Sequence, residues 1–200
     1  MILPLKKTWL FLCMAFIMAL FLAGCGHTVN LTEKRIDGID SQITIALPGN
    51  AHELPLPVTL DPLTQRYLKG QRFYGEINQG LHIGIFTVSI DSGQMYSDLH
   101  LTNGQVLGNT LSENIERASQ AILSSIDAEN ISAQQEAASV SGEHAVKQTY
   151  TFTVEDKRMK AQLMGFSHGN ATWVILVACD ADSKNAPAID DIMKSITITK

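Results

Sequence analysis

Seven consecutive residues near the end of the chain read Trp173-Val174-Ile175-Leu176-Val177-Ala178-Cys179. Successive side chains of a strand point to opposite faces, so a strand with one solvent-exposed (wet) face alternates apolar and polar residues. This run is apolar at both its odd and its even positions, which is typical of a strand in the middle of a sheet with both faces covered. We therefore expect it to be the central strand of the fold, with Val174 and Ile175 facing opposite sides.

The segments on both sides of this run are predicted to be its neighbours in an antiparallel sheet. Apolar and polar residues alternate over Ala145–Glu155, the pattern of a strand with one wet face. Lys160–Phe166 is expected to be the next strand, and His168-Gly169-Asn170 turns the chain into the central run. Beyond that run, an apolar stripe in Ala188–Ser195 indicates a closing helix, and Thr197–Thr199 indicates a terminal strand.

The first half of the chain supplies further strands and a short helix. Ile43–Leu47 alternates and is predicted to be the first strand, and residues 54–62 form a loop with three prolines. A short helix is expected over Pro62–Lys69, because proline suits the first helical position. Phe73–Asn78 and Leu81–Asp91 are predicted to be the two strands of a hairpin, since both are rich in β-branched and aromatic residues.

The clearest helix is expected over Leu111–Ile126. Its apolar residues recur at spacings of four, three, four and four, which places them on one face. These residues are Leu111, Ile115, Ala118, Ile122 and Ile126. All these elements together predict an α+β fold, with helices packed on an antiparallel sheet, in one globular domain over residues 43–200.

The order of elements resembles the PsbP-like superfold and, within it, the bacterial DcrB-like lipoproteins. The resemblance is most family-like over Thr149–Ile198, where a polar-faced strand, a turn, the central run and the helix Ile189-Asp190-Asp191-Ile192-Met193-Lys194-Ser195-Ile196 follow one another. It implies an α/β/α sandwich. It brings no catalytic residues. It also does not choose a function, because the superfold includes photosystem subunits, a nuclear-transport regulator and envelope lipoproteins.

The amino-terminal residues have the features of an export signal. Lys6 and Lys7 precede an apolar run over Thr8–Leu22, which is short for a membrane span. The run closes on Leu22-Ala23-Gly24-Cys25, a pattern that resembles the bacterial lipoprotein lipobox.

The lipobox resemblance implies cleavage between Gly24 and Cys25 and attachment of lipid, including palmitate-type acyl chains, to Cys25. We therefore expect a signal peptide over residues 1–24 and a tether over residues 25–42. The protein is then lipid-anchored on the extracytoplasmic face of a bacterial cell membrane. Gly26 replaces the aspartate that marks inner-membrane retention in enteric-type bacteria, and both an inner and an outer membrane stay open.

Composition limits the partners. Removing 24 of 200 residues leaves 176, enough for one well-buried domain. That part carries 13 basic and 20 acidic residues, a net charge of −7, which argues against nucleic acid and against anionic lipid surfaces recognised through bulk charge. Cys13 leaves with the signal and Cys25 is acylated, so Cys179 has no disulfide partner and is expected to be a packed thiol.

No grouping of residues has the spacing that catalysis or metal binding needs. Asp98 with His100, and Ser167 with His168, supply hydrolytic residue types without a nucleophile elbow or a triad order. The glycines of residues 104–108 lie in a loop, without the spacing of a nucleotide cradle. We expect no cofactor and no metal, because no two histidines stand at ligand spacing. The histidines are His27, His52, His82, His100, His144 and His168.

The connection over Asp91–Asn109 is long for a compact domain and carries Met95, Tyr96 and Leu99 among polar residues. These three are the candidate partner-binding residues, with a mobile loop of no special role as the alternative. We expect a non-catalytic binding or assembly module of the cell envelope that joins an envelope protein complex. The alternative is a small-ligand-binding or hydrolytic domain with a site assembled from distant strands, which a cavity lined by apolar groups with convergent polar residues would favour.

Overall fold

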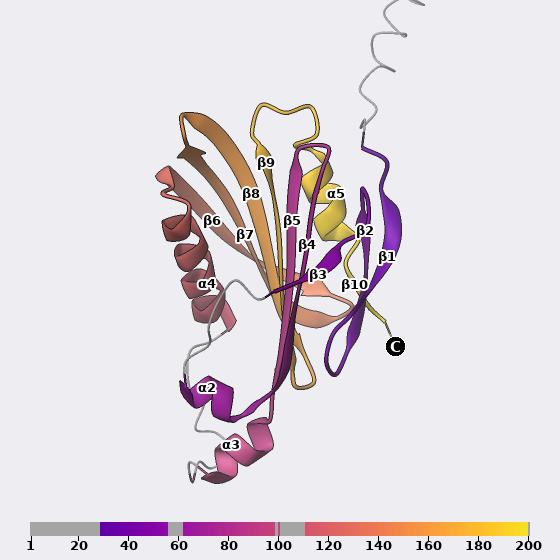
Figure 1. The fold of residues 1–200 in the computed structure, drawn as a ribbon, viewed down its shortest axis with the longest axis vertical. Coiled ribbons are helices and arrows are strands. Elements are labelled where there is room, and N and C mark those ends of the chain that lie inside the picture. The colour runs from indigo at the N-terminus through magenta and orange to yellow at the C-terminus, as the bar shows by residue number, and fades with distance from the viewer. Residues whose placement is uncertain (1–28, 56–61, 99, 101–110, 200) are drawn as a thin grey trace, which may run out of the picture.

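The computed structural model describes residues 29–55, 62–98, 100 and 111–199. In that part of the chain the strands are β1 (Thr32–Asp37), β2 (Gln42–Leu47), β3 (His52–Leu54), β4 (Leu68–Asn78), β5 (Leu81–Ile90), β6 (Glu129–Val140), β7 (Glu143–Val154), β8 (Lys157–His168), β9 (Ala171–Asp180) and β10 (Thr197–Thr199). They form two antiparallel sheets (Figure 1). The seven-stranded sheet has the order β3-β4-β5-β9-β8-β7-β6, and the three-stranded sheet has the order β1-β2-β10.

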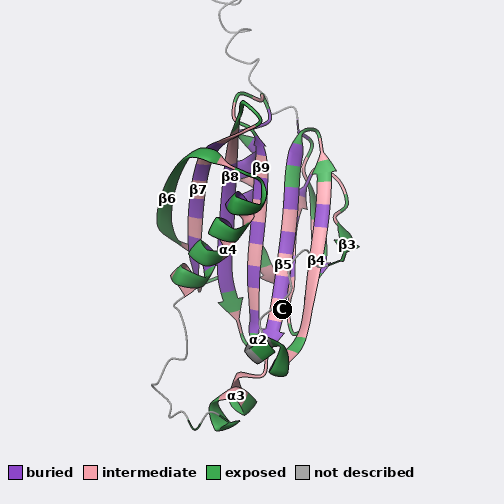
Figure 2. Cartoon of the chain, turned by 60° about the vertical axis from the view of Figure 1, so that its left-hand side comes forward, coloured by how far each residue is buried: buried purple, intermediate pink, exposed green. Residues whose placement is uncertain are grey.

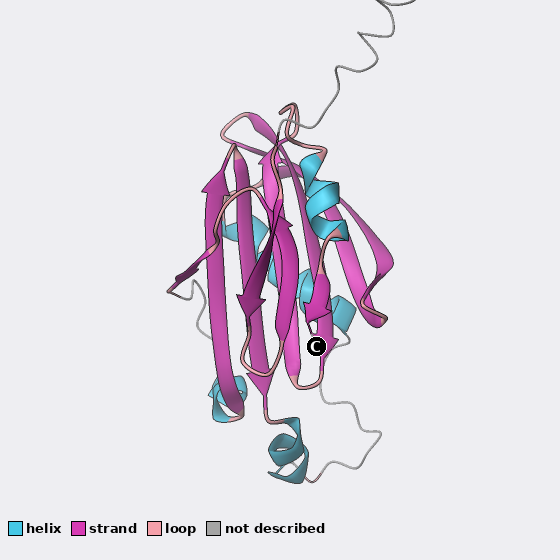
Figure 3. Cartoon of the chain, turned by 90° about the vertical axis from the view of Figure 1, so that its right-hand side faces the viewer, coloured by secondary structure: helices cyan, strands magenta, loops and turns pink. Residues whose placement is uncertain are grey.

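The described helices are α2 (Pro62–Arg66), α3 (Ser92–Asp98), α4 (Leu111–Ser125) and α5 (Ala188–Lys194). Two of them, α4 and α5, cover the two faces of the large sheet (Figure 1). α4 packs on β7 and β8 on one face, here called the outer face. α5 and the small sheet cover the other, inner face (Figures 1 and 3). The predicted α+β fold with helices packed on an antiparallel sheet is confirmed.

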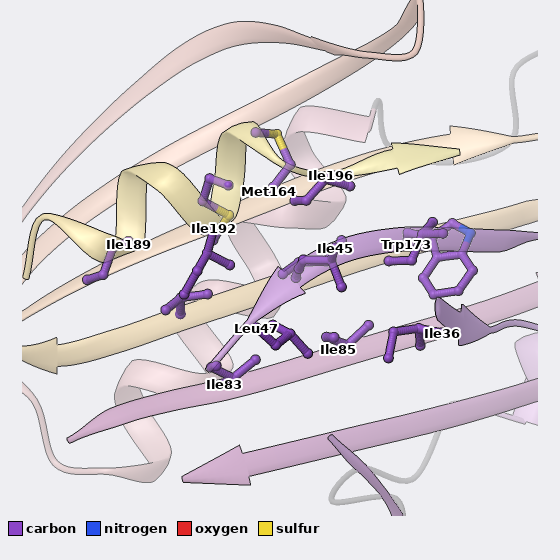
Figure 4. Close-up of a cluster of buried hydrophobic side chains, with 14 of the residues drawn as sticks. Ile36, Ile45, Leu47, Ile83, Ile85, Met164, Trp173, Ile189, Ile192 and Ile196 are labelled. Atoms are coloured by element: carbon purple, nitrogen blue, oxygen red, sulfur yellow. The ribbon is translucent and has the colours of Figure 1, made fainter. Parts of the chain in front are cut away.

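β9 is the central strand, fourth of seven, as the apolar run predicted. On the inner face Trp173, Ile175, Val177 and Cys179 are fully buried, against side chains of α5 and β2 (Figure 4). On the outer face its residues Val174, Leu176 and Ala178 are only partly buried. The expectation of full cover on both faces is therefore wrong for the outer face, because α4 lies over β7 and β8, beside β9.

The inner core is closed by the turn between β1 and β2. Trp173 Nε1 donates a hydrogen bond of 2.8 Å to Ser41 Oγ, and its ring stacks on Phe166 with 6.5 Å between the ring centroids. A β-carbon added at Gly38 would lie 2.5 Å from Trp173 Cζ2. Glycine at this position therefore lets the turn approach the indole.

The start of the fold differs from the sequence prediction. Residues 25–42 were expected to be a tether, but β1 lies within them and pairs with β2 from Thr32 opposite Leu47 to Asp37 opposite Gln42. Ile36 is its one fully core-facing residue, at 4% exposure. A strand at a sheet edge with a single buried apolar side chain leaves no alternating pattern, which is why β1 was missed.

Two further elements were missed because they bury little. β6 is one of the two edge strands of the large sheet, and nearly all its side chains are exposed (Figure 2). α3 lies in the connection after Asp91 that was predicted to be a loop, and none of its residues is buried. The short strand β3 was also not predicted. The predicted short helix, the hairpin of β4 and β5, α4, the strands β2 and β7 to β9, and the closing α5 and β10 are confirmed.

Candidate functional site

A hollow of about 420 Å³ lies between α4 and the outer face of the large sheet. We call it the α4 groove. Its lining is mostly apolar and comes from one helix and four strands. The lining residues are His82, Ser119, Ile122, Leu123, Ile126, Tyr150, Phe152, Val154, Glu155, Lys157, Met159, Ala161, Leu163, Leu176 and Ala178.

The position of α4 is fixed by a close approach to β8. Ile115 is 1% exposed and lies over Gly165, where an added β-carbon would collide with the Ile115 side chain. Val146 and Leu163 complete this contact. Because the helix rests on β7 and β8, the neighbouring outer face of β9 and β5 is left beside it (Figure 2).

The apolar face of α4 is therefore only half covered. Its buried residues are Ile115, Ser119 and Leu123. Ile122 is partly buried and Ile126 is 38% exposed, although both belong to the predicted apolar stripe. These two side chains face the groove, opposite Leu176 and Ala178 of β9.

A hydrogen-bond network lies at one side of the groove. The Tyr150 hydroxyl is 2.6 Å from both Ser119 Oγ and Gln148 Oε1. Ser119 Oγ donates to the Glu116 carbonyl at 2.8 Å, and Gln148 Nε2 donates to Gln135 Oε1 at 2.8 Å. Burial raises the pKa of Tyr150, although its hydrogen bond with Ser119 acts in the opposite direction. The phenol is thus held neutral and acts as a hydrogen-bonding group.

Beyond this network is a second hollow of about 470 Å³ between α4 and β6. Leu123 and Tyr150 line both hollows and so stand between them. The second hollow is more polar than the groove, with four glutamines and Glu116 among its lining residues. The outer face therefore presents an apolar site and a polar site on the two sides of α4.

The exposed lining residues of the α4 groove gather at one end of the domain. His82 follows the turn between β4 and β5, Ile126 follows the end of α4, and Glu155 and Lys157 flank the turn between β7 and β8. These segments lie at the same end of the molecule (Figure 1). The rim of the groove thus carries one carboxylate, one ammonium group and one imidazole around an apolar interior.

Two of the three residues predicted to bind a partner lie in the described part of the chain. Met95 and Tyr96 lie on α3, where Tyr96 is 36% exposed and Met95 is partly buried. Asp98 at the end of α3 forms an ion pair of 3.1 Å with Arg66 and accepts a hydrogen bond from Tyr67 at 3.4 Å. Leu99 lies outside the described residues, as do Gly24 and Cys25 of the predicted lipid-attachment site.

The residues considered for hydrolysis do not meet in one site. His168 Nδ1 is 2.9 Å from Glu143 Oε1, and Ser167 Oγ is 3.1 Å from Thr172 Oγ1. Among the described residues, Asp98 forms its ion pair with Arg66 and not with a histidine. Cys179 is fully buried, which raises the pKa of its thiol, and the prediction of a packed thiol is confirmed.

Within residues 29–55, 62–98 and 111–199, no three His, Cys, Asp or Glu side chains are grouped so as to hold a metal ion. Over the same ranges, no helix has the length and apolar character needed to cross a membrane.

Sequence reasoning missed the groove, although it identified several of its residues. Ile122 and Ile126 were predicted to lie on the apolar stripe of a helix, and Ala161, Leu163 and Leu176 in strands. Two local signals were present. One was Gly165, a glycine inside a strand, which often marks a close approach of another element. The other was Tyr150, which carries a polar hydroxyl on the mostly apolar side of its strand.

The fold is similar to solved structures of low sequence identity. CyanoP, the PsbP protein of the cyanobacterium Synechocystis sp. PCC 6803, matches with a TM-score of 0.50 and 11% identity, over 88% of this chain and 98% of that one. LpqN of Mycobacterium tuberculosis, described as involved in cell envelope biogenesis, matches with a TM-score of 0.42 and 13% identity, over 86% and 92% of the two chains. No protein-family model and no curated protein sequence matches this chain. The likeness to CyanoP supports the predicted PsbP-like fold and concerns the fold alone.

Proposed function

We propose that this chain is a non-catalytic binding module of the bacterial cell envelope, lipid-anchored at Cys25, and that the α4 groove binds a small apolar molecule or the apolar part of one. The observation that carries the proposal is the half-covered apolar wall formed by Ile122, Leu176 and Ala178. Binding sites for small molecules are usually apolar hollows of about 300 to 1,000 Å³ with a few polar groups. The groove fits this description.

The energetics favour an apolar occupant. Each methylene group that moves from water into the groove contributes about 0.8 kcal/mol. The groove offers such a group the side chains of α4 on one side and of β9 on the other. The hydroxyls of Ser119 and Tyr150 are the polar groups within reach, and they can orient a ligand oxygen.

The polar groups of the groove suit binding better than reaction. Tyr150 and Ser119 hydrogen-bond to each other and to Gln148, and the raised pKa of Tyr150 disfavours a phenolate base. Ser167 and His168, the hydrolytic residue types considered above, stand at the end of β8 away from the lining of the groove. This arrangement supports a module that holds a molecule without converting it.

A second candidate function is assembly with an envelope protein through α3. It is favoured by the absence of buried residues in α3 and by the exposure of Tyr96. The test is crosslinking of membranes that contain the wild type or the variant with Met95, Tyr96 and Leu99 changed to Ala. A stoichiometric partner that the triple variant loses would support this function.

The anchor is tested by labelling cells with a radioactive or clickable fatty acid. We expect label on the wild type and none on Cys25→Ala. Each buried methylene of an acyl chain contributes about 0.8 kcal/mol, so two or more chains at one residue give stable anchoring. Equal labelling of the two proteins would refute the anchor without bearing on the groove.

The groove is tested by organic extraction of the protein purified from membranes, followed by mass spectrometry of the extract. Ala178→Trp fills the groove, and Ile77→Trp is the control. Ile77 is 75% exposed and outside the lining, and its pairing with His82, which pairs with Ala178, places it on the same face. We expect a stoichiometric apolar molecule with the wild type and Ile77→Trp, and its loss with Ala178→Trp. An identical extract from all three proteins would refute the proposed site.

A further inference from the structure

The α4 groove opens at the end of the domain where the described chain begins. Thr32 of β1 pairs with Leu47 of β2. Two residues beyond Leu47, a β-carbon at Gly49 would lie 2.6 Å from Asn78 Nδ2, at the turn between β4 and β5. His82 at the groove rim directly follows this turn. Figure 1 shows the start of β1, this turn and the turn between β7 and β8 at one end of the molecule.

The distance from this end to the lipid is short. Val29, the first described residue, is 7% exposed and belongs to the inner core. Cys25 precedes it by four residues, which span at most about 14 Å when fully extended. If Cys25 carries the anchor, as the proposed function states, the groove end of the domain faces the bilayer and α3 points away from it.

From this geometry we propose that the α4 groove accepts one acyl chain of a membrane glycerophospholipid from the leaflet in which Cys25 is anchored. The proposal rests on the proposed function and names its ligand. The groove supplies the apolar walls that an acyl chain needs, and Ile126, exposed at the rim, extends that surface toward the membrane.

The charges of the rim do not select a headgroup. Glu155 and Lys157 both line the groove, one carboxylate beside one ammonium group, so their effects on a charged headgroup offset each other. The lack of headgroup selection agrees with the net negative charge of the chain, which does not attract it to anionic lipid surfaces. Recognition therefore takes place through the acyl chain.

The inner-face core does not offer the same site. Val29 and the small sheet lie on the face opposite α4 (Figure 3), so the described chain begins on the other side of the large sheet from the groove. Acyl chains attached close to Val29 would have to pass around this end of the sheet to enter the groove. A lipid of the leaflet below the groove meets no such obstacle.

The test uses the full chain in native membranes, with the photoreactive amino acid p-benzoylphenylalanine placed at Ile126 or at Tyr96. The two positions are matched in exposure, at 38% and 36%, but lie at opposite ends of the domain (Figure 1). Illumination should give a phospholipid adduct, recognised by its mass, at position 126 and none at position 96. Adding Ala178→Trp should abolish the adduct at position 126, whereas Ile77→Trp should leave it unchanged.

Each other outcome overturns the inference in a defined way. Equal adducts at both positions would refute the orientation, and an adduct insensitive to Ala178→Trp would mean surface contact with the membrane only. A link between position 126 and the peptide that carries Cys25 would assign the groove to the protein's own anchor. If extraction still yields an apolar molecule that Ala178→Trp removes, but no phospholipid adduct forms, the proposed function stands and this inference fails.

Discussion

The side chain of Ile115 on α4 lies directly over Gly165 on β8, in space that a β-carbon at position 165 would occupy. This contact sets how closely the helix approaches the sheet. It also leaves the last two turns of α4 beside β9, where the groove forms.

We predict that Gly165→Ala destabilises the fold by about 1 to 3 kcal/mol, because the added methyl group overpacks a filled site. The measurement is urea unfolding followed by tryptophan fluorescence. Gly93→Ala is the control, since the nearest atom to an added β-carbon there is 3.6 Å away, an ordinary contact. In a double-mutant cycle, Ile115→Ala should cost less in the Gly165→Ala background than alone. Additive losses would show that the two residues do not restrict each other.

The two faces of β9 should respond differently to charge. Ile175 is fully buried on the inner face, so Ile175→Asp should cost about 3 kcal/mol or more, because it buries an unpaired carboxylate. Val174 is partly buried on the outer face, and Val174→Asp should cost distinctly less. Equal losses in urea unfolding would contradict the half-covered outer face.

The sequence was sufficient to predict the elements with strong patterns. Each of these elements buries enough apolar surface to leave a recognisable pattern of apolar residues in the sequence. They are the apolar run of β9, the hairpin of β4 and β5, and the stripe of α4. β1 and β6 lie at sheet edges, and each has a single buried residue. Their sequences therefore show no such pattern.

The groove could not be predicted in the same way. The stripe that includes Ile122 and Ile126 is the same whether a sheet covers it fully or in part. Which part is covered depends on where the helix rests, and that position is set by Gly165 from a distant strand. Tyr150 and Ser119, which meet at 2.6 Å, are 31 residues apart in the chain.

Tyr150→Phe should remove the hydrogen bonds of the phenol to Ser119 and Gln148 and change how stability depends on pH. Loss of the hydroxyl should cost about 1 kcal/mol at neutral pH. Because the pKa of Tyr150 is raised in the folded state, folding favours the protonated phenol. Its contribution is present below the unfolded pKa of about 10 and is lost as the pH rises above it. The free energies of unfolding of the wild type and Tyr150→Phe should therefore converge above about pH 10. Curves that remain parallel would contradict the buried, neutral phenol.

Photolabelling with a small apolar diazirine tests most directly whether the α4 groove is the binding site. The lipidated protein is labelled in its membranes, and the modified residues are mapped by mass spectrometry. We predict that label concentrates on Ile122, Leu176 and Ala178 and disappears from them in Ala178→Trp. Leu54 and Tyr96, at 44% and 36% exposure, lie outside the groove and outside the second hollow and serve as controls. Label on these two that equals or exceeds the label on the groove residues would contradict the account.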